Sequence, residues 1–199
     1  YIDNHTDFTI IGPVYRSKDY ASHGLFEDLK NKNFQDDNLN NSSLIKTHWI
    51  VGCTMFIDLD KFNSKSLFDE NYFLFFEEFD LCRRVLNNDG KILVSKNLFV
   101  KHLGHKGSVA ADPRYEKDSA FLRSWHWMWS SFYYYKKNNN YLYALFKMSG
   151  KFIKSLMKTI IFSIFYNKIK QTAYFARFYG LVCSFLGIKS FYRVKSLFK

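Results

Sequence analysis

The stretch SLFDENYFLFFEEFDLCRRVLNNDGKILV, residues 66–94, combines an acidic cluster, a helical pattern and the start of a strand. Apolar residues recur at helical spacing from Phe79 to Leu86, and the polar run at residues 87–90 ends in glycine, which predicts a helix and its stop. Glu77 and Glu78 then lie at the helix N-terminus, where the helix dipole stabilises negative side chains. Because that placement alone accounts for acidic residues, other motifs must decide whether these ones act in catalysis.

The segments on either side of this helix have the pattern of strands. An apolar run at residues 7–14 and a run rich in β-formers at residues 44–59 each predict a strand. Two shorter strands are expected at residues 91–94 and 98–102. Gly52 in the second run marks a bulge or a close approach of another group.

The chain after about residue 112 is expected to be helical, with a break at residues 138–140. In residues 151–170, apolar residues recur at helical spacing while lysines take other positions. No run reaches the ~18–20 uncharged apolar residues of a spanning helix. Two readings stay open: the helix lies on a membrane surface, or it packs its apolar face on the core of the protein.

Charge is distributed unevenly along the 199 residues. All 18 acidic residues lie in residues 1–118, whereas residues 119–199 contain 14 of the 29 basic residues and no acid. A basic block can meet nucleic acid or an anionic membrane. The residues between these cations are apolar and aromatic, and the chain has no known nucleic-acid motif. We therefore expect an anionic membrane surface as a partner, and no nucleic acid.

Two further features concern processing and compartment. The three cysteines, Cys53, Cys82 and Cys183, are odd in number and far apart, which fits neither a disulfide framework nor a metal ribbon. We expect all three to be buried thiols in a reducing compartment. The first residues lack an initiating Met and the pattern of a signal peptide. We therefore expect the chain to be a piece of a longer protein.

The motifs taken together resemble the C-terminal half of the catalytic domain of family 2 glycosyltransferases, in particular rhamnosyltransferase-like enzymes of polysaccharide assembly. The resemblance covers about residues 7–137 and, more weakly, residues 180–193. The counterparts in this chain are Gly52 with the following CTMFI, Phe68-Asp69-Glu70, Glu77-Glu78, Asp80-Leu81-Cys82-Arg83-Arg84, Gly90, and His102 with Gly104, Gly107 and Ser108.

The resemblance implies the nucleotide-sugar-binding α/β fold called GT-A, with a mixed sheet and flanking helices. Residues 1–112 would form the C-terminal half of that catalytic domain, and residues 113–199 a basic, aromatic-rich helical tail associated with the membrane. The implied cofactor is a divalent metal, Mn²⁺ or Mg²⁺, held mainly by an Asp-x-Asp in the absent first half. Asp58-Leu59-Asp60 has that spacing, but it follows the strand after Gly52, where the family has no metal motif.

The resemblance also implies roles for the acidic residues. Glu78 occupies the position of the base that deprotonates the acceptor hydroxyl, although many members of the family have Asp there. Glu77 or Asp80 would help to orient it, and the two arginines that follow would pair with the acids or face solvent. Trp49 would bind the acceptor, because sugar faces stack on aromatic rings, and His48 is a second candidate on that side. Core packing is the alternative for both aromatic side chains.

The remaining site residues follow the last expected strand. His102 matches a position that completes the metal site in some members, and a structural histidine is the alternative. The glycine loop would close over the donor diphosphate, whose charge favours a cation and backbone N–H donors. A plain flexible loop is equally compatible with its composition. The residues assigned to this loop are His105, Lys106, Gly107 and Ser108.

The function expected from the resemblance is inverting transfer of a sugar, with rhamnose as the candidate, in cell-surface polysaccharide synthesis. The donor would be a nucleotide diphosphate sugar, and the acceptor a lipid-linked or growing glycan. The enzyme would be peripheral on the cytoplasmic side of the inner membrane. The alternative is a non-catalytic module that binds a membrane surface or nucleic acid, which the basic aromatic tail suggests.

Overall fold

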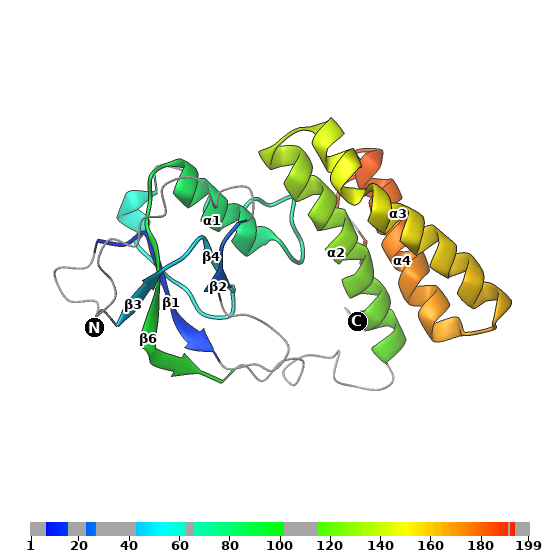
Figure 1. The fold of residues 1–199 in the computed structure, drawn as a ribbon, viewed down its shortest axis with the longest axis horizontal. Coiled ribbons are helices and arrows are strands. Elements are labelled where there is room, and N and C mark those ends of the chain that lie inside the picture. Colours follow the sequence, from blue (N-terminus) through cyan, green and yellow to red (C-terminus); the bar gives the residue numbers. More distant parts are fainter. Residues whose placement is uncertain are drawn as a thin grey trace. The chain divides into compact units, whose positions relative to one another are not determined.

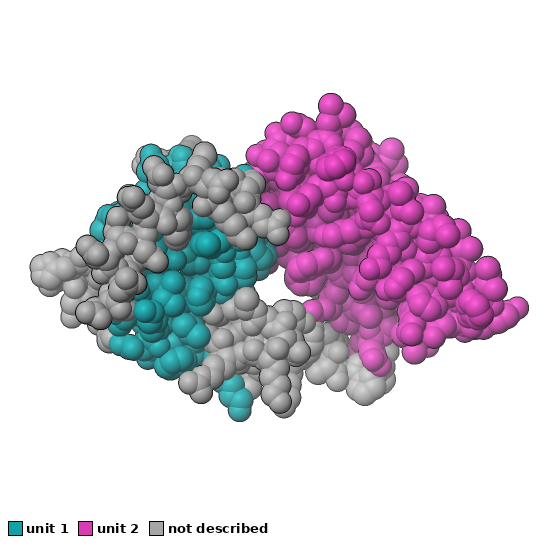
Figure 2. Space-filling view, viewed as in Figure 1, with its two compact units in different colours: residues 1–69, 78–103 teal, residues 70–77, 104–199 magenta. Residues whose placement is uncertain are grey.

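The structure is a computed structural model, and it describes residues 7–15, 23–26, 43–62, 66–101, 115–190 and 192–193. The chain divides into two compact units. The first falls within residues 1–69 and 78–103, and the second within residues 70–77 and 104–199 (Figure 2). The boundary expected at residue 112 lies outside the described residues.

The first unit contains a four-stranded mixed sheet in the order β3-β6-β1-β5. β1 pairs in parallel with β6, and β3 pairs antiparallel with β6 (Figure 1). β5 pairs antiparallel with β1. A mixed α/β architecture is therefore confirmed. The strands are β1 (Ile10–Tyr15), β3 (Leu44–Lys46), β5 (Phe56–Ile57) and β6 (Ile92–Val100).

The helix expected after the acidic pair is confirmed as α1 (Glu77–Asn87). Its apolar side is buried, with Leu81 and Cys82 fully inaccessible to solvent. The helix stops as the sequence predicted: Asp89 takes a left-handed backbone angle of 56°, and the Gly90 N–H donates to the Val85 carbonyl oxygen at 2.9 Å. A Cβ at Gly90 would lie 2.6 Å from Val85 Cγ1, so only glycine fits at this position.

The single strand expected at residues 44–59 is wrong, because the chain changes partners within that segment. After β3, the Thr47 side chain donates to the Gly24 carbonyl oxygen, and the chain enters a separate two-stranded ribbon. This ribbon pairs β2 (His23–Gly24) with β4 (Trp49–Ile50), and only β5 returns to the main sheet. Partners distant in the sequence decided these breaks.

β6 is one strand of nine residues, whereas two shorter strands were expected. Its pairing with β1 is interrupted: Pro13 lies opposite Ser95, but Val14 lies opposite Phe99. Proline has no N–H to donate to a neighbouring strand, which is consistent with an irregularity at this position. The extra residues of β6 therefore bulge out of the ladder while the strand continues.

The second unit consists of three packed helices, α2 (Glu116–Asn138), α3 (Tyr141–Ile164) and α4 (Lys168–Phe185) (Figure 1). Asn140 and Asn167 cap α3 and α4, each accepting a hydrogen bond from the backbone N–H of the third residue of its helix. The cap at Asn140 agrees with the expected break at residues 138–140. One core cluster joins all three helices and contains Met128, Phe132, Ala144, Met148 and Leu181.

The run at residues 151–170 is not one helix, as the pattern had suggested. α3 ends at Ile164, and the chain turns through residues 165–167 before α4 begins. Tyr166 has a left-handed φ of 51° in this turn. Among the described helices, none is long and apolar enough to cross a membrane.

Residues 70–77 belong to the helical unit and pack their aromatic rings along α2. Phe75 and Phe76 both contact the ring of Trp127, with centroids 5.2 and 5.3 Å apart. The Ser130 hydroxyl donates to the Leu74 carbonyl oxygen at 2.9 Å. Phe75 and Phe76 have φ angles of 68° and 71°, which is unfavourable for bulky residues. Their ring contacts with α2 stabilise this strained turn directly before Glu77.

Candidate functional site

The first turn of α1 carries the acidic residues, and helix geometry separates two of them. Glu78 and Asp80 are two positions apart, so they lie roughly 200° apart around the helix axis. Asp80 is fully buried, and its Oδ2 accepts a hydrogen bond from Arg84 Nε at 3.2 Å. Arg84 also donates to the Leu67 carbonyl oxygen. The expected pairing of arginine with an acid is therefore present, and Asp80 lies on the side of α1 opposite to Glu78.

Glu78 lies beside Gly52, which is 26 positions earlier in the sequence. A Cβ placed on Gly52 would lie 3.4 Å from Glu78 Cβ and 3.9 Å from its carboxyl carbon. Gly52 and the adjacent Cys53 are both exposed. A Cβ at position 52 would thus make only ordinary van der Waals contact with Glu78. Oε2 of Glu78 is itself buried, and the approach brings an exposed glycine next to this side chain.

Trp49 packs near the same part of α1. Its ring centroid lies 5.0 Å from that of Phe79, the residue after Glu78. On the other side Trp49 lies against Gly24, where a Cβ would come within 2.7 Å of the indole. The half-buried indole thus has a packing role, and it lies in the segment that leads to Gly52.

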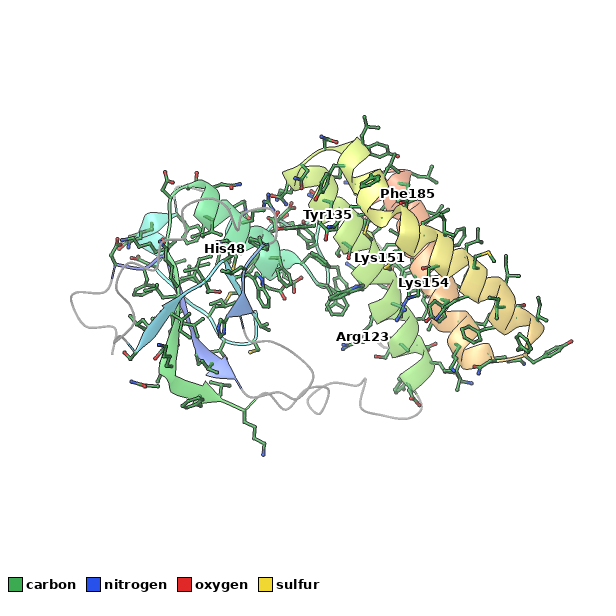
Figure 3. All side chains as sticks on the ribbon, viewed as in Figure 1. His48, Arg123, Tyr135, Lys151, Lys154 and Phe185 are labelled. Carbon is green, nitrogen blue, oxygen red and sulfur yellow. The ribbon has the colours of Figure 1, made fainter. Side chains whose placement is uncertain are left out.

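His48, the other aromatic candidate on the acceptor side, is a buried structural residue (Figure 3). Its Nδ1 accepts a hydrogen bond from the Phe26 backbone N–H at 2.9 Å. Its ring also stacks with Phe26 at a centroid distance of 6.0 Å. A donor to Nδ1 leaves the ring proton of a neutral imidazole on Nε2. His48 therefore holds the chain near residue 26 in place.

Glu77, the first residue of α1, has a pKa above its ordinary value because burial disfavours the ionised carboxylate. A hydrogen bond from its own backbone N–H acts in the opposite direction but is weaker. Glu77 Oε2 is buried and has no hydrogen-bond partner among the described residues. A carboxylate with a raised pKa is a stronger base, so Glu77 competes with Glu78 for the role of proton acceptor.

Several predicted site residues lie outside the described residues, so the structure neither brings them together with Glu78 nor separates them from it. These are His102, His105, Lys106, Gly107 and Ser108. Within the described ranges, no three His, Cys, Asp or Glu side chains form a group able to hold a metal ion. Asp58 caps a 3₁₀ turn, accepting a hydrogen bond from the Asp60 N–H at 3.2 Å, and pairs with Lys61.

The structure contains a polar cleft near the C-terminal end of α1, which the sequence did not predict. Its walls include Asp7, Lys61, Arg84 and Lys91. Asp7 accepts from Lys61 Nζ at 2.6 Å and from Lys91 Nζ at 2.7 Å, and these two lysines lower its pKa to about 2. Lys61 and Lys91 lie 54 and 84 positions after Asp7, so no local sequence pattern connects the three residues. Such exposed ion pairs contribute little to stability.

The cysteines are less uniform than the sequence analysis predicted. Cys82 and Cys183 are buried, but Cys53 is exposed beside Gly52. Burial raises the pKa of the Cys82 thiol to about 12, so that thiol stays protonated at neutral pH. The expectation of three buried thiols is therefore wrong for Cys53, because it follows the glycine at the surface near Glu78.

Neither protein-family models, curated proteins nor solved structures give a match to this chain.

Proposed function

We propose that the chain is the acceptor-side half of an inverting glycosyltransferase that uses a nucleotide diphosphate sugar. The observation that carries the proposal is the approach of Gly52 to Glu78. Two motif positions from separate segments meet there, which brings an exposed glycine beside a carboxylate side chain. In the proposal, the acceptor approaches Glu78 from the side of Gly52, because a base must lie within hydrogen-bond reach of the hydroxyl that it deprotonates.

In the proposed reaction, an acceptor hydroxyl attacks the anomeric carbon of the donor sugar. The new C–O bond forms as the bond to the diphosphate breaks, and the configuration inverts. Glu78 takes the hydroxyl proton and becomes neutral, while the nucleotide diphosphate leaves with the bonding electron pair. The strained turn at Phe75 and Phe76 directly precedes this helix.

The diphosphate carries the charge that develops as the bond breaks. A divalent metal, Mn²⁺ or Mg²⁺, would neutralise part of that charge when bound, with His102 as the one ligand assigned to this chain. In the proposal, His105, Lys106, Gly107 and Ser108 supply a cation and backbone N–H donors to the same group. Trp49 borders the acceptor side, because it packs on the residue next to Glu78.

The acceptor in this proposal is a lipid-linked or growing glycan, and rhamnose is the candidate sugar. A lipid-linked acceptor places the reaction at a membrane surface. We therefore propose a peripheral location on the cytoplasmic side of the inner membrane, with the product used in cell-surface polysaccharide synthesis.

The test is substitution of Glu78 by Gln, which keeps the size of the side chain and removes the basic oxygen. Because general-base help is worth ~10²–10⁴ in rate, turnover should fall by at least ~10²-fold while donor binding changes little. The measurement is sugar transfer by the complete polypeptide to which residues 1–199 belong, with donor binding measured by calorimetry.

Two matched variants decide between the acids. Glu77→Gln should cost less than Glu78→Gln if Glu77 only orients its neighbour, and Asp80→Asn should lower stability along with activity, because Asp80 pairs with Arg84. A Glu77→Gln enzyme that is inactive beside a fully active Glu78→Gln enzyme would move the base to Glu77. If all three variants keep parental turnover, the proposed chemistry is wrong.

A further inference from the structure

The outer face of α3 carries large apolar side chains that no described element covers. Their exposed fractions range from 48% to 81%. They recur at intervals of three, four or seven positions, which places them on one face of the helix. The six residues, here called the outer stripe, are Leu142, Phe146, Ile153, Met157, Ile160 and Ile164.

α3 does not need this stripe for its own packing. The opposite face of the helix, which includes Ala144, Met148 and Ser155, is buried against α2 and α4. A helix on the surface of a soluble domain ordinarily has one apolar face and one polar face. Here α3 has two apolar faces. An exposed apolar surface of this kind marks a site that binds another molecule or a membrane.

The apolar surface continues at the α3–α4 turn. Phe165 and Tyr166 are 75% and 88% exposed, and Ile169 in the first turn of α4 is also exposed. Tyrosine combines an apolar ring with a polar hydroxyl, and such side chains are enriched where hydrocarbon meets lipid headgroups. The end of the helical hairpin therefore has the composition of an interfacial anchor.

The charge of α3 and α4 has one sign, which bears on the occupant of the outer stripe. The lysines of α3 lie on the flank of the helix, roughly 120° around its axis from the stripe. α3 carries four lysines and no acidic residue, and α4 likewise has no acid. Lys151 and Lys154 lie on the side of α3 nearer to α2 (Figure 3), and Lys147 and Lys158 lie at helical spacing from them. Long lysine side chains beside an apolar face can reach anionic headgroups while the face enters the acyl region.

Other occupants fit these observations less well. A second copy of the chain would bring together two helical units that carry only basic charge from residue 119 onward, and such units repel each other. Single-stranded nucleic acid needs aromatic rings for base stacking, whereas Leu142, Ile153 and Ile160 are aliphatic. An anionic bilayer surface is the occupant that uses both the aliphatic stripe and the cations on the flank of the same helix.

We propose that the outer stripe of α3, together with the α3–α4 turn, lies in the interfacial layer of an anionic phospholipid bilayer. α3 has 24 residues, which at about 1.5 Å each gives roughly 36 Å of helix lying along the surface. This inference rests on the membrane location in the proposed function but not on its chemistry. It identifies which surface of the chain meets the membrane that holds a lipid-linked acceptor.

The experiment is sedimentation of the full 199-residue chain with vesicles of phosphatidylcholine alone or mixed with phosphatidylglycerol. The parent should bind the anionic vesicles more tightly. The stripe variant Ile153→Gln/Met157→Gln/Ile160→Gln should lose at least roughly tenfold in affinity, because burial of these side chains stabilises the bound state. The lysine variant Lys147→Gln/Lys151→Gln/Lys154→Gln should lose a similar factor on anionic vesicles only.

A matched control removes exposed leucines from the first unit. Leu25→Gln/Leu59→Gln/Leu98→Gln deletes three exposed apolar residues outside the stripe and should bind like the parent. Circular dichroism should show parental helix content in the stripe variant, since its three changed residues are exposed. Glu78→Gln should also bind vesicles normally, so loss of catalysis and loss of membrane binding remain distinguishable.

Three outcomes would overturn the proposal. The first is a stripe variant that binds anionic vesicles as tightly as the parent. The second is a parent chain that does not bind vesicles and is a dimer as measured by light scattering, while the stripe variant is a monomer. The third is a parent chain that does not bind vesicles but binds single-stranded nucleic acid through its lysines.

Discussion

At the scale of single residues, the acidic cluster contains three carboxylates in three different environments. Asp80 is buried and paired with Arg84, Glu78 lies beside Gly52, and Glu77 is partly buried at the start of α1. Three acids within four positions look alike in a sequence. The helix directs each side chain to a different side of its axis, so only Glu78 lies beside Gly52.

Glu77 makes stability depend on pH in a defined direction. Burial raises its pKa in the folded state above the usual value of 4.5. Above the folded pKa the carboxyl is ionised in both states, and burying the charge costs stability. That cost decreases as the pH falls through the folded pKa, and it is absent below the unfolded value. Glu77→Gln should therefore unfold at a higher temperature than the parent at about pH 7, with the difference vanishing near pH 4.

Differential scanning calorimetry across this pH range measures the effect. Asp7 provides a contrast, because its pKa is lowered to about 2 by Lys61 and Lys91. An Asp7→Asn variant should show no stability gain at neutral pH. A Glu77→Gln variant less stable than the parent at neutral pH would show that the carboxylate makes a favourable contact instead.

At the scale of elements, close approach of α2 and α4 depends on one glycine. A Cβ on Gly180 would lie 2.4 Å from the Trp125 carbonyl oxygen, a backbone atom that cannot rotate away. Gly150 in α3 is its natural comparison, because a Cβ there would meet nothing within 4 Å. Both glycines lie within helices, where alanine is intrinsically favoured by about 1 kcal/mol.

The two Gly→Ala substitutions should therefore have opposite effects. Gly150→Ala should raise the free energy of unfolding by roughly 0.5–1 kcal/mol, as helix propensity predicts. Gly180→Ala should lower it by roughly 1–3 kcal/mol, because α2 and α4 must separate to admit the methyl group. Urea unfolding followed by circular dichroism measures both. Equal stabilisation by the two variants would mean that α4 is not held this close to α2.

At the scale of the whole molecule, the chain builds two cores. The core of the sheet unit includes Ile10, Leu81 and Ile92, all fully buried, and the core of the helical unit includes Trp125 and Phe132. The acidic residues concentrate in the part of the chain that forms the sheet, whereas the helices from residue 119 onward carry only basic charge. A catalytic surface and a membrane surface are therefore proposed for different units.

Hydrogen exchange should show two separate sets of slowly exchanging amides. Amides in buried and fully paired segments open least often, so residues 92–95 of β6 and 125–132 of α2 should be the most protected. The exposed end of α3 near residues 161–164 should exchange faster than α2. Mass spectrometry of the exchanged chain measures this pattern. Protection confined to the helices would contradict an independent core in the sheet unit.

Local sequence patterns determined the elements that depend on neighbouring residues. The stripe from Phe79 to Leu86 and the Asn-Asn-Asp-Gly stop predicted α1, and the asparagine break predicted the start of α3. The uneven charge was also evident from the sequence. Caps, helix stops and periodicity act within a few positions, so one sequence suffices to recognise them.

Only the tertiary structure decided which distant residues meet. The split of residues 44–59 followed from pairing with Gly24, β6 and β1, and the contact of Gly52 with Glu78 spans 26 positions. The sequence left open whether the apolar residues of α3 face the core or the surface. The structure shows two apolar faces, because packing against α2 and α4 uses one side of α3 and leaves the outer stripe exposed. Pairing and burial are properties of the assembled chain, which no local pattern specifies.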